Sequence, residues 1–179
     1  MVLPLPAFVS ADDLKTAALV AVRNVLNEHN RCRALMRELA TAGRLAIHLS
    51  RHPIIRRLED EENILTEPEY ATSGLHGDPK RAVLEDNHAE EGVRPDVIVH
   101  KRGIEGPNCM VIEVKMGDWR SRPRRVQQRD QWKIEALTSA GRFEYALGLW
   151  FALPKRPDGP GYYAEFRGGA QVGPIVPIP

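Results

Sequence analysis

Two acidic residues and a lysine stand out because their spacing can bring their side chains together. In CMVIEVKMG (109–117), side chains alternate between the two faces of a predicted strand, so Glu113 and Lys115 share one face. The positions between them are apolar and fill the opposite face. Asp96 begins a second alternating segment, PDVIVH (95–100). A hairpin of these two strands gathers two carboxylates and an ammonium on one face of a sheet.

The position of the hairpin turn decides how these groups meet. With the turn centred between Glu105 and Gly106, Asp96 lies opposite Lys115 and diagonal to Glu113. A register shifted by two residues places Asp96 opposite Glu113 instead. A shift by one residue sends the two acids to opposite faces, and the wholly apolar set behind Glu113 argues against that arrangement.

Two carboxylates that lie close together repel each other, and a divalent cation between them removes the repulsion. Asp96 and Glu113, with a backbone carbonyl such as that of Val114, offer the oxygen ligands that suit Mg²⁺ or Mn²⁺. Such a cation activates water and polarises a phosphate oxygen. Lys115 can orient that water or offset charge that develops on the phosphate. The pattern therefore predicts Asp96, Glu113 and Lys115 as catalytic residues of a phosphodiester hydrolase.

The motif PD at 95–96 followed by EVK at 113–115 resembles the PD-(D/E)XK superfamily, whose fold is that of restriction endonucleases. The predicted order of elements over residues 11–153 is similar to the core of that superfamily. The segments NEHN, EPEY, RPDVIVHKRG, PNCMVIEVK and RDQWK are similar to a group of small prokaryotic members. The resemblance implies metal binding by the two acids and assistance of hydrolysis by the lysine.

The resemblance also implies further site residues on two helices. An acidic residue on the first helix often completes the metal site in such proteins, and Glu28 is the candidate because it lies on the apolar stripe of that helix. An inward carboxylate needs a partner, and an arginine is the alternative to a metal; Glu38 is the second candidate. A polar residue on the helix after the EVK strand often faces the site, which points to Lys133. An ordinary ion pair with Asp130 is the alternative there.

Basic residues crowd the segment between Lys115 and Lys133. Such a loop beside an acidic site is typical of contact with a phosphate backbone. A solvated charged loop is the alternative. We predict nucleic-acid contacts by Lys133 and by four arginines, Arg120, Arg122, Arg124 and Arg125.

The surrounding sequence supplies the elements that must position these residues. Ser10 is a suitable N-cap for the first helix, and Pro68 indicates an edge or bulged strand. The segment 73–93 has the composition of a long connection. The predicted elements are helices at 11–30, 31–52, 54–63 and 126–141, strands at 64–72, 95–102, 109–117, 145–154 and 161–168, and a proline-rich extended tail at 168–179.

This order predicts an α/β fold, with a mixed central sheet flanked by helices. With the resemblance, the expected architecture is a restriction-endonuclease-like three-layer sandwich. The chain of 179 residues fits a single domain, with its core at about 11–167 and the tail outside it. The net charge of +1 means that any basic surface must be local.

Composition and the lack of targeting patterns bear on location. No apolar run approaches the ~18 residues of a membrane span, and MVLPLPAFVS lacks the basic start of a signal peptide. We therefore expect no membrane contact and a cytoplasmic protein. Cys32 and Cys109 lie far apart without metal-binding spacing, so free thiols are expected.

Two hypotheses of function follow. The first is a nuclease that depends on Mg²⁺ or Mn²⁺ and hydrolyses nucleic acid, with DNA favoured over RNA, through a metal-activated water. The second is a non-catalytic protein with a nuclease fold that binds nucleic acid or a protein partner. The presence of Asp96, Glu113 and Lys115 together favours the first. The small size and the lack of a recognisable DNA-reading domain favour a chain that works with partners or as a homodimer.

Overall fold

The computed structural model describes residues 4–32, 37–68, 72–73, 78–79, 81–83, 90–92, 94–102, 106–117, 124–141, 143–156 and 159–179. Its helices are α1 (Ala11–Cys32), α2 (Glu38–Ser50), α3 (Pro53–Glu62) and α4 (Arg124–Thr138). Its strands are β1 (Ile64–Pro68), β2 (Thr72–Ser73), β3 (Asp78–Pro79), β4 (Arg81–Val83), β5 (Glu90–Gly92), β6 (Val97–Lys101), β7 (Asn108–Met116), β8 (Leu147–Leu153), β9 (Tyr162–Arg167) and β10 (Ala170–Pro177).

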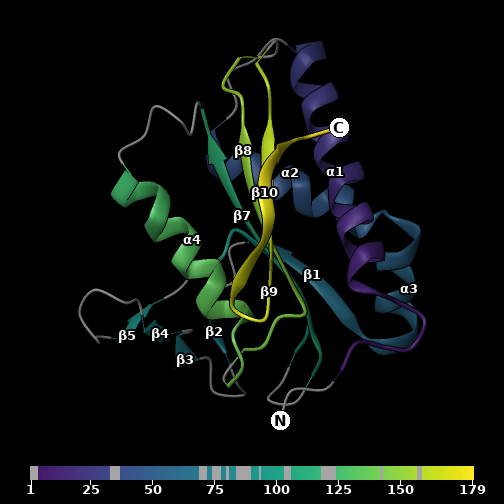
Figure 1. Ribbon diagram of the computed structural model, residues 1–179. Coiled ribbons are helices and arrows are strands. Elements are labelled where there is room, and N and C mark those ends of the chain that lie inside the picture. Colours follow the sequence, from purple (N-terminus) through teal and green to yellow (C-terminus); the bar gives the residue numbers. More distant parts are fainter. Residues whose placement is uncertain are drawn as a thin grey trace.

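One mixed sheet organises the fold. Its six strands follow the order β1-β6-β7-β8-β9-β10, while β2 pairs with β3 and β4 with β5 in two short ladders. Within the sheet, β7 and β8 are parallel and the other neighbours are antiparallel. Helix α4 supplies the crossover that a parallel pair requires. Figure 1 shows α1, α2 and α3 on one side of the sheet and α4 on the other. The predicted α/β fold with a mixed, helix-flanked sheet is confirmed at this level.

Each face of the sheet has its own hydrophobic core. On the side of α1, α2 and α3, the side chains of Met110, Ile112 and Val114 are fully buried. On the side of α4, Ile98 and Val111 are fully buried against apolar side chains of that helix. The apolar alternate set of β7 therefore lies on one face, as predicted, and the polar set lies on the face that α4 covers.

Gly148 of β8 lets α4 come close to the sheet. A Cβ atom at this position would lie 2.4 Å from Ile134 Cγ2 and 2.8 Å from Thr138 Cγ2. Any larger residue would force these side chains, or the helix itself, away from the sheet. The missing side chain thus helps to set the height of α4 above the sheet, and with it the position of the polar residues one turn earlier on the helix.

The ends of the first three helices follow local signals. Ser10 Oγ accepts a hydrogen bond from Asp13 N–H at 3.1 Å, and Asp13 Oδ2 accepts one from Ser10 N–H at 2.9 Å, a reciprocal cap. The second helix begins at Glu38 rather than at residue 31, because α1 continues through Cys32. Helix α3 starts at Pro53, one residue before the predicted start at 54, because proline is well suited to the first turn of a helix.

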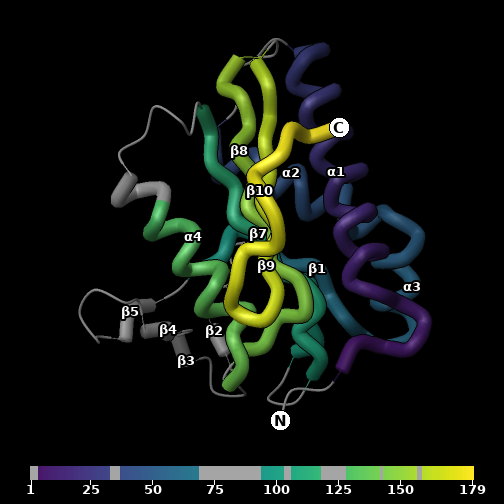
Figure 2. Tube along the Cα trace, in the orientation of Figure 1, coloured from purple at the N-terminus to yellow at the C-terminus, as the bar shows by residue number. Residues whose placement is uncertain are grey.

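The proline-rich tail forms an edge strand. Strand β10 pairs with β9, with an irregularity between Val172 and Val176 where Gly173 has a φ of 72°. An edge strand tolerates proline because its outer N–H groups need no partner in the sheet. Arg23 Nε donates a hydrogen bond to the carbonyl of Pro179 at 2.7 Å, so the tail reaches α1. Figure 2 traces this path. The sequence predicts the extended shape but not the pairing, which carries the sheet beyond residue 167.

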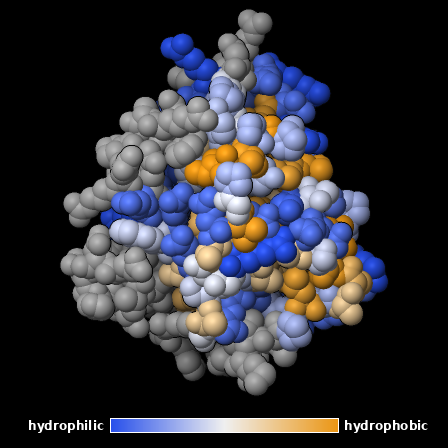
Figure 3. All heavy atoms as spheres, in the orientation of Figure 1, coloured by the Kyte–Doolittle hydropathy of each residue, from blue (hydrophilic) through white to orange (hydrophobic). Residues whose placement is uncertain are grey.

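The surface is mainly hydrophilic on the face that Figure 3 presents, with hydrophobic patches beside α3 and along β10. In the described ranges, no helix combines the length and hydrophobicity needed to cross a bilayer. Cys32 is exposed and Cys109 is buried, and both are free, as expected.

Candidate active site

The hairpin of β6 and β7 brings Asp96 and Glu113 level with each other. The two strands are antiparallel, and their register reaches Val97↔Ile112. One residue further along each strand, Asp96 lies opposite Glu113. This is the register shifted by two residues from the one with Asp96 opposite Lys115. The two carboxylates therefore meet where β6 begins.

Asp96 is partly buried and binds the backbone of the neighbouring strand. Its Oδ2 accepts a hydrogen bond from Val114 N–H at 2.6 Å. Burial and the charge of Glu113 raise the pKa of Asp96 from 3.8 to about 7. The Val114 hydrogen bond and the charges of Lys115 and Lys133 oppose this rise without cancelling it. Asp96 therefore binds its proton more tightly than an aspartate in water does.

Glu113 is largely buried, with only 3% of its side chain exposed. It belongs to a cluster of charged side chains formed by Asp96, Glu113, Lys115, Lys133, Glu38 and Asp130. Its Oε1 accepts a hydrogen bond from Lys115 Nζ at 3.1 Å, and its Oε2 accepts one from Lys133 Nζ at 2.6 Å. A buried carboxylate of this kind is strongly destabilising unless it is paired. The two lysines supply that pairing, one from the same strand and one from α4.

Three carboxylates from three different elements surround Lys115. Its Nζ lies 2.9 Å from Glu38 Oε1 of α2, 3.1 Å from Glu113 Oε1 of β7 and 3.8 Å from Asp130 Oδ1 of α4. Burial alone would lower the pKa of Lys115, but the charge of Glu113 and the hydrogen bond to Glu38 raise it above its ordinary value. The Lys115 side chain stays charged, and its ammonium lies between the oxygen atoms of the three carboxylates.

Lys133 joins the cluster from the opposite side. Besides Glu113, its Nζ donates a hydrogen bond to the carbonyl oxygen of Arg94, two residues before Asp96. The helix after the EVK strand thus faces the site, as the resemblance implies. The ammonium predicted to contact nucleic acid lies instead against a carboxylate within the cluster. Its role toward nucleic acid stays a prediction.

Glu28 points towards α2. Its Oε2 lies 2.7 Å from Arg44 Nη1, and its Oε1 lies 3.0 Å from His48 Nε2. This is the pairing with an arginine considered as the alternative. Glu38, the second candidate, contacts Lys115 from the layer that α1, α2 and α3 form. These contacts favour Glu38 over Glu28 as the third acid of the site.

Of the four arginines predicted to bind nucleic acid, two lie outside the described residues. These are Arg120 and Arg122. Arg124 and Arg125 form the first residues of α4, which places their backbone on the helix that carries Asp130.

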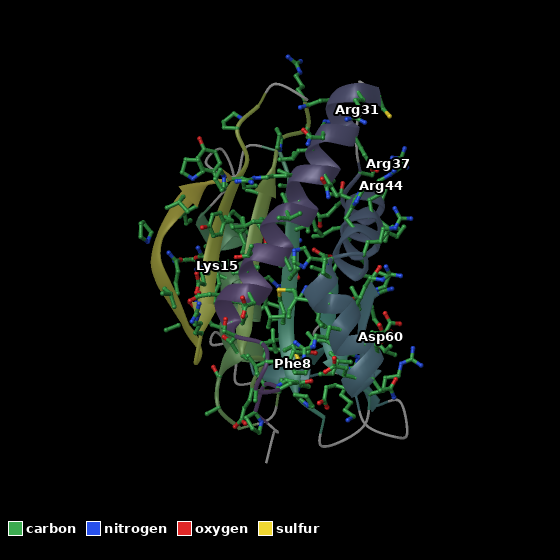
Figure 4. The ribbon with its side chains drawn as sticks, turned by 90° about the vertical axis from the view of Figure 1, so that its right-hand side faces the viewer. Phe8, Lys15, Arg31, Arg37, Arg44 and Asp60 are labelled. Atoms are coloured by element: carbon green, nitrogen blue, oxygen red, sulfur yellow. The ribbon has the colours of Figure 1, made fainter. Side chains whose placement is uncertain are left out.

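The α1–α2 layer carries a second group of arginines that the sequence did not single out. Figure 4 shows Arg31, Arg37 and Arg44 at the same end of this layer. All three are exposed, and Arg37 directly precedes Glu38, whose carboxylate contacts Lys115. Arg31 lies in α1, Arg37 directly precedes α2 and Arg44 lies in α2, so their common location depends on how the two helices pack.

A separate polar group links β1 to β6. His100 Nε2 lies 2.6 Å from Glu67 Oε2, and Arg102 Nε donates to Glu67 Oε1 at 3.0 Å. Burial would raise the pKa of Glu67, but the hydrogen bonds from Arg102 and His100 hold it below its ordinary value. These contacts tie the edge strand to the hairpin and account for His100 without a catalytic role.

The donor atoms of the cluster fit a hard cation in chemical type. Asp96, directly before β6, and Glu113 of β7 are neighbouring carboxylates, and burial together with the charge of Glu113 raises the pKa of Asp96. In the part of the chain that the structure describes, no three His, Cys, Asp or Glu side chains are grouped closely enough to hold a metal. Both oxygens of Glu113 accept hydrogen bonds from lysines.

Comparison with protein-family models, curated proteins and solved structures finds no match to this chain. Its function is therefore inferred from the geometry of the site and from the sequence motif.

Proposed function

We propose that this protein is a metal-dependent nuclease of the PD-(D/E)XK type that hydrolyses phosphodiester bonds, with DNA favoured over RNA. The observation that supports it is the arrangement on the hairpin. Asp96 and Glu113 lie opposite each other on antiparallel strands, and Lys115 shares their face. A restriction-endonuclease-like fold is part of the proposal, and the mixed sheet with helices on both faces is compatible with it.

Each residue of the cluster has a role in this proposal. Asp96 and Glu113 would hold Mg²⁺ or Mn²⁺, with Glu38, a contact of Lys115, as a further candidate carboxylate. Such a cation supplies positive charge that acidifies water and draws electrons from the phosphate. Lys115 stabilises the negative charge that develops on the phosphate oxygens. In the reaction, a water oxygen bonds to phosphorus as one P–O ester bond breaks, and the leaving oxygen receives a proton.

Local basic surfaces support a nucleic-acid partner. The exposed arginines Arg31, Arg37 and Arg44 lie at the end of the α1–α2 layer where Glu38 reaches the cluster (Figure 4). With a net charge of only +1, the chain can attract a polyanion only through such patches. We propose nucleic acid as the partner on this basis, with a homodimer as the arrangement that would enlarge the contact surface.

The test is cleavage of single-stranded, duplex and branched DNA and of RNA, with Mg²⁺ or Mn²⁺ and with chelator. Glu113→Gln is expected to abolish cleavage, because the amide retains the shape but loses the charge. Lys115→Ala is expected to slow cleavage on the order of a hundredfold and to leave Mn²⁺ binding largely intact. Glu28→Gln is the matched control, since Glu28 pairs with Arg44 and His48. Equal cleavage by wild type and Glu113→Gln would indicate a contaminant.

A binding protein without catalytic activity is the second candidate. One observation favours it: both oxygens of Glu113 are paired with lysines, so the cluster can be stable without a cation. No cleavage of any substrate, together with no Mn²⁺ binding, would decide for this candidate. Fluorescence anisotropy with labelled DNA and RNA would then measure binding at several salt concentrations.

A further inference from the structure

The two lysines on Glu113 differ in how much they depend on it. Lys115 also contacts Glu38 and Asp130, so it retains two carboxylate partners when Glu113 turns away. Among the described residues, the contacts of Lys133 besides Glu113 are limited to the neutral carbonyl of Arg94. Of the two lysines, Lys133 is therefore the one whose position depends more on its ion pair with Glu113.

Lys133 also fixes the segment that carries Asp96. Its Nζ bridges Glu113 Oε2 and the Arg94 carbonyl, two residues before Asp96. The ammonium of Lys133 thus holds both the Glu113 carboxylate and the backbone that leads to Asp96. A divalent cation held by Asp96 and Glu113 would lie close to the ammonium on Oε2 of Glu113, and two positive charges at such a short distance repel strongly.

We propose that Lys133 is an internal competitor of the divalent cation, whose ammonium occupies Oε2 of Glu113 and must leave when the cation binds. This inference rests on the proposed function. It assigns Lys133 to the control of metal affinity. The side chain of Lys133 is 18% exposed, so the released ammonium has a route to the solvent side of the cluster. There it can contact a substrate phosphate, which would couple metal binding to substrate binding.

The experiment compares Mn²⁺ binding by wild type and Lys133→Met, using calorimetric titration and the electron paramagnetic resonance signal of free Mn²⁺. Removal of the competing charge is expected to raise the affinity by on the order of tenfold or more. Thermal unfolding gives a second measurement. Without Mn²⁺ the variant should unfold at a lower temperature, because Glu113 loses a partner, and Mn²⁺ should raise that temperature more than in wild type.

Lys15→Met is the matched control. Lys15 Nζ also pairs with a largely buried glutamate, at 3.2 Å from Glu165 Oε2, and this pair joins α1 to β9. Like Lys133→Met, Lys15→Met deletes one positive charge, but it should leave the Mn²⁺ affinity unchanged. Lys133→Arg retains the charge and should bind Mn²⁺ as wild type does. If Lys133→Met fails to fold, Lys133→Gln carries the same expectation.

The outcomes separate this inference from the proposed function. Tighter Mn²⁺ binding by Lys133→Met than by wild type and Lys15→Met supports competition, including the case in which only the variant binds measurably. Equal or weaker binding by Lys133→Met overturns the competition and leaves the proposed metal site in place. If wild type, Lys133→Met and Lys133→Gln all fail to bind Mn²⁺, both the inference and the proposed metal-dependent function are overturned.

Discussion

Asp96→Asn should remove a pH-dependent loss of stability from the metal-free protein. In the fold, burial and the charge of Glu113 raise the pKa of Asp96 from 3.8 to about 7. The folded state therefore binds this proton more tightly than the unfolded chain does. The free energy of unfolding falls as the pH rises from about 4 to about 7, and the loss is complete above that range.

The size of the effect follows from the two pKa values. About three pH units between them, at 1.36 kcal/mol each, correspond to about 4 kcal/mol between pH 4 and pH 8. Asparagine retains an oxygen that can accept the hydrogen bond of Val114 N–H, so the local backbone contact can survive the substitution. Relative to Asp96→Asn, wild type should therefore become less stable as the pH rises.

Urea unfolding in the presence of chelator, at intervals from pH 4 to pH 8, measures this difference. Asp13→Asn is the control, because hydrogen bonds from Ser10 lower the pKa of Asp13 and so place its titration below this range. The difference in stability between wild type and that variant should therefore stay nearly constant from about pH 5 to pH 8. A difference between wild type and Asp96→Asn that stays constant across the range would refute the argument that burial and Glu113 raise the pKa of Asp96.

Two further changes test the positioning of the cluster. Gly148→Ala should destabilise the fold by about 1–3 kcal/mol, because its Cβ would lie 2.4 Å from Ile134 Cγ2. Urea unfolding measures this loss, and an unchanged unfolding midpoint would show that α4 moves freely. Glu38→Gln should alter Mn²⁺-dependent cleavage through its contact with Lys115. Glu28→Gln should leave Mn²⁺ affinity within about twofold, since the Glu28 carboxylate is paired with Arg44 and His48. Loss of Mn²⁺ binding in Glu28→Gln would restore that residue to the site.

The sequence predicts which face Glu113 occupies but not its partner across the hairpin. Alternation in β7 is a local property, so the apolar and polar sets can be read from nine residues. The register depends on the turn between the two strands. Lys101 N–H donates a hydrogen bond of 3.2 Å to the Pro107 carbonyl across this turn. The register also depends on the irregularity beyond Val99, which the side-chain pattern does not show.

The third acid shows a different limit of the sequence. Glu28 follows the apolar stripe of α1, so periodicity predicts that it points inward. At the end of that helix, however, the inward direction meets α2, where Arg44 and His48 are available. Glu38 begins α2, and its contact with Lys115 depends on how two helices pack on the sheet. No local pattern encodes that arrangement.

The position of Lys133 is predictable only in part. Its helix follows the EVK strand, so the topology brings it over the same face of the sheet. Its contact with Glu113 at 2.6 Å needs the helix at a particular height, to which Gly148 of a later strand contributes. The sequence does not connect those two positions.

Prolines lie on both edges of the sheet. Pro68 limits β1 to the four N–H groups that precede it, and Pro174 and Pro177 interrupt the row of N–H groups in β10. A strand from another molecule would find gaps where it needs hydrogen bonds, which protects the sheet against edge-to-edge aggregation. Two copies of the chain would therefore have to associate through faces or helices. Replacing Pro174 and Pro177 with valine would remove that protection from one edge.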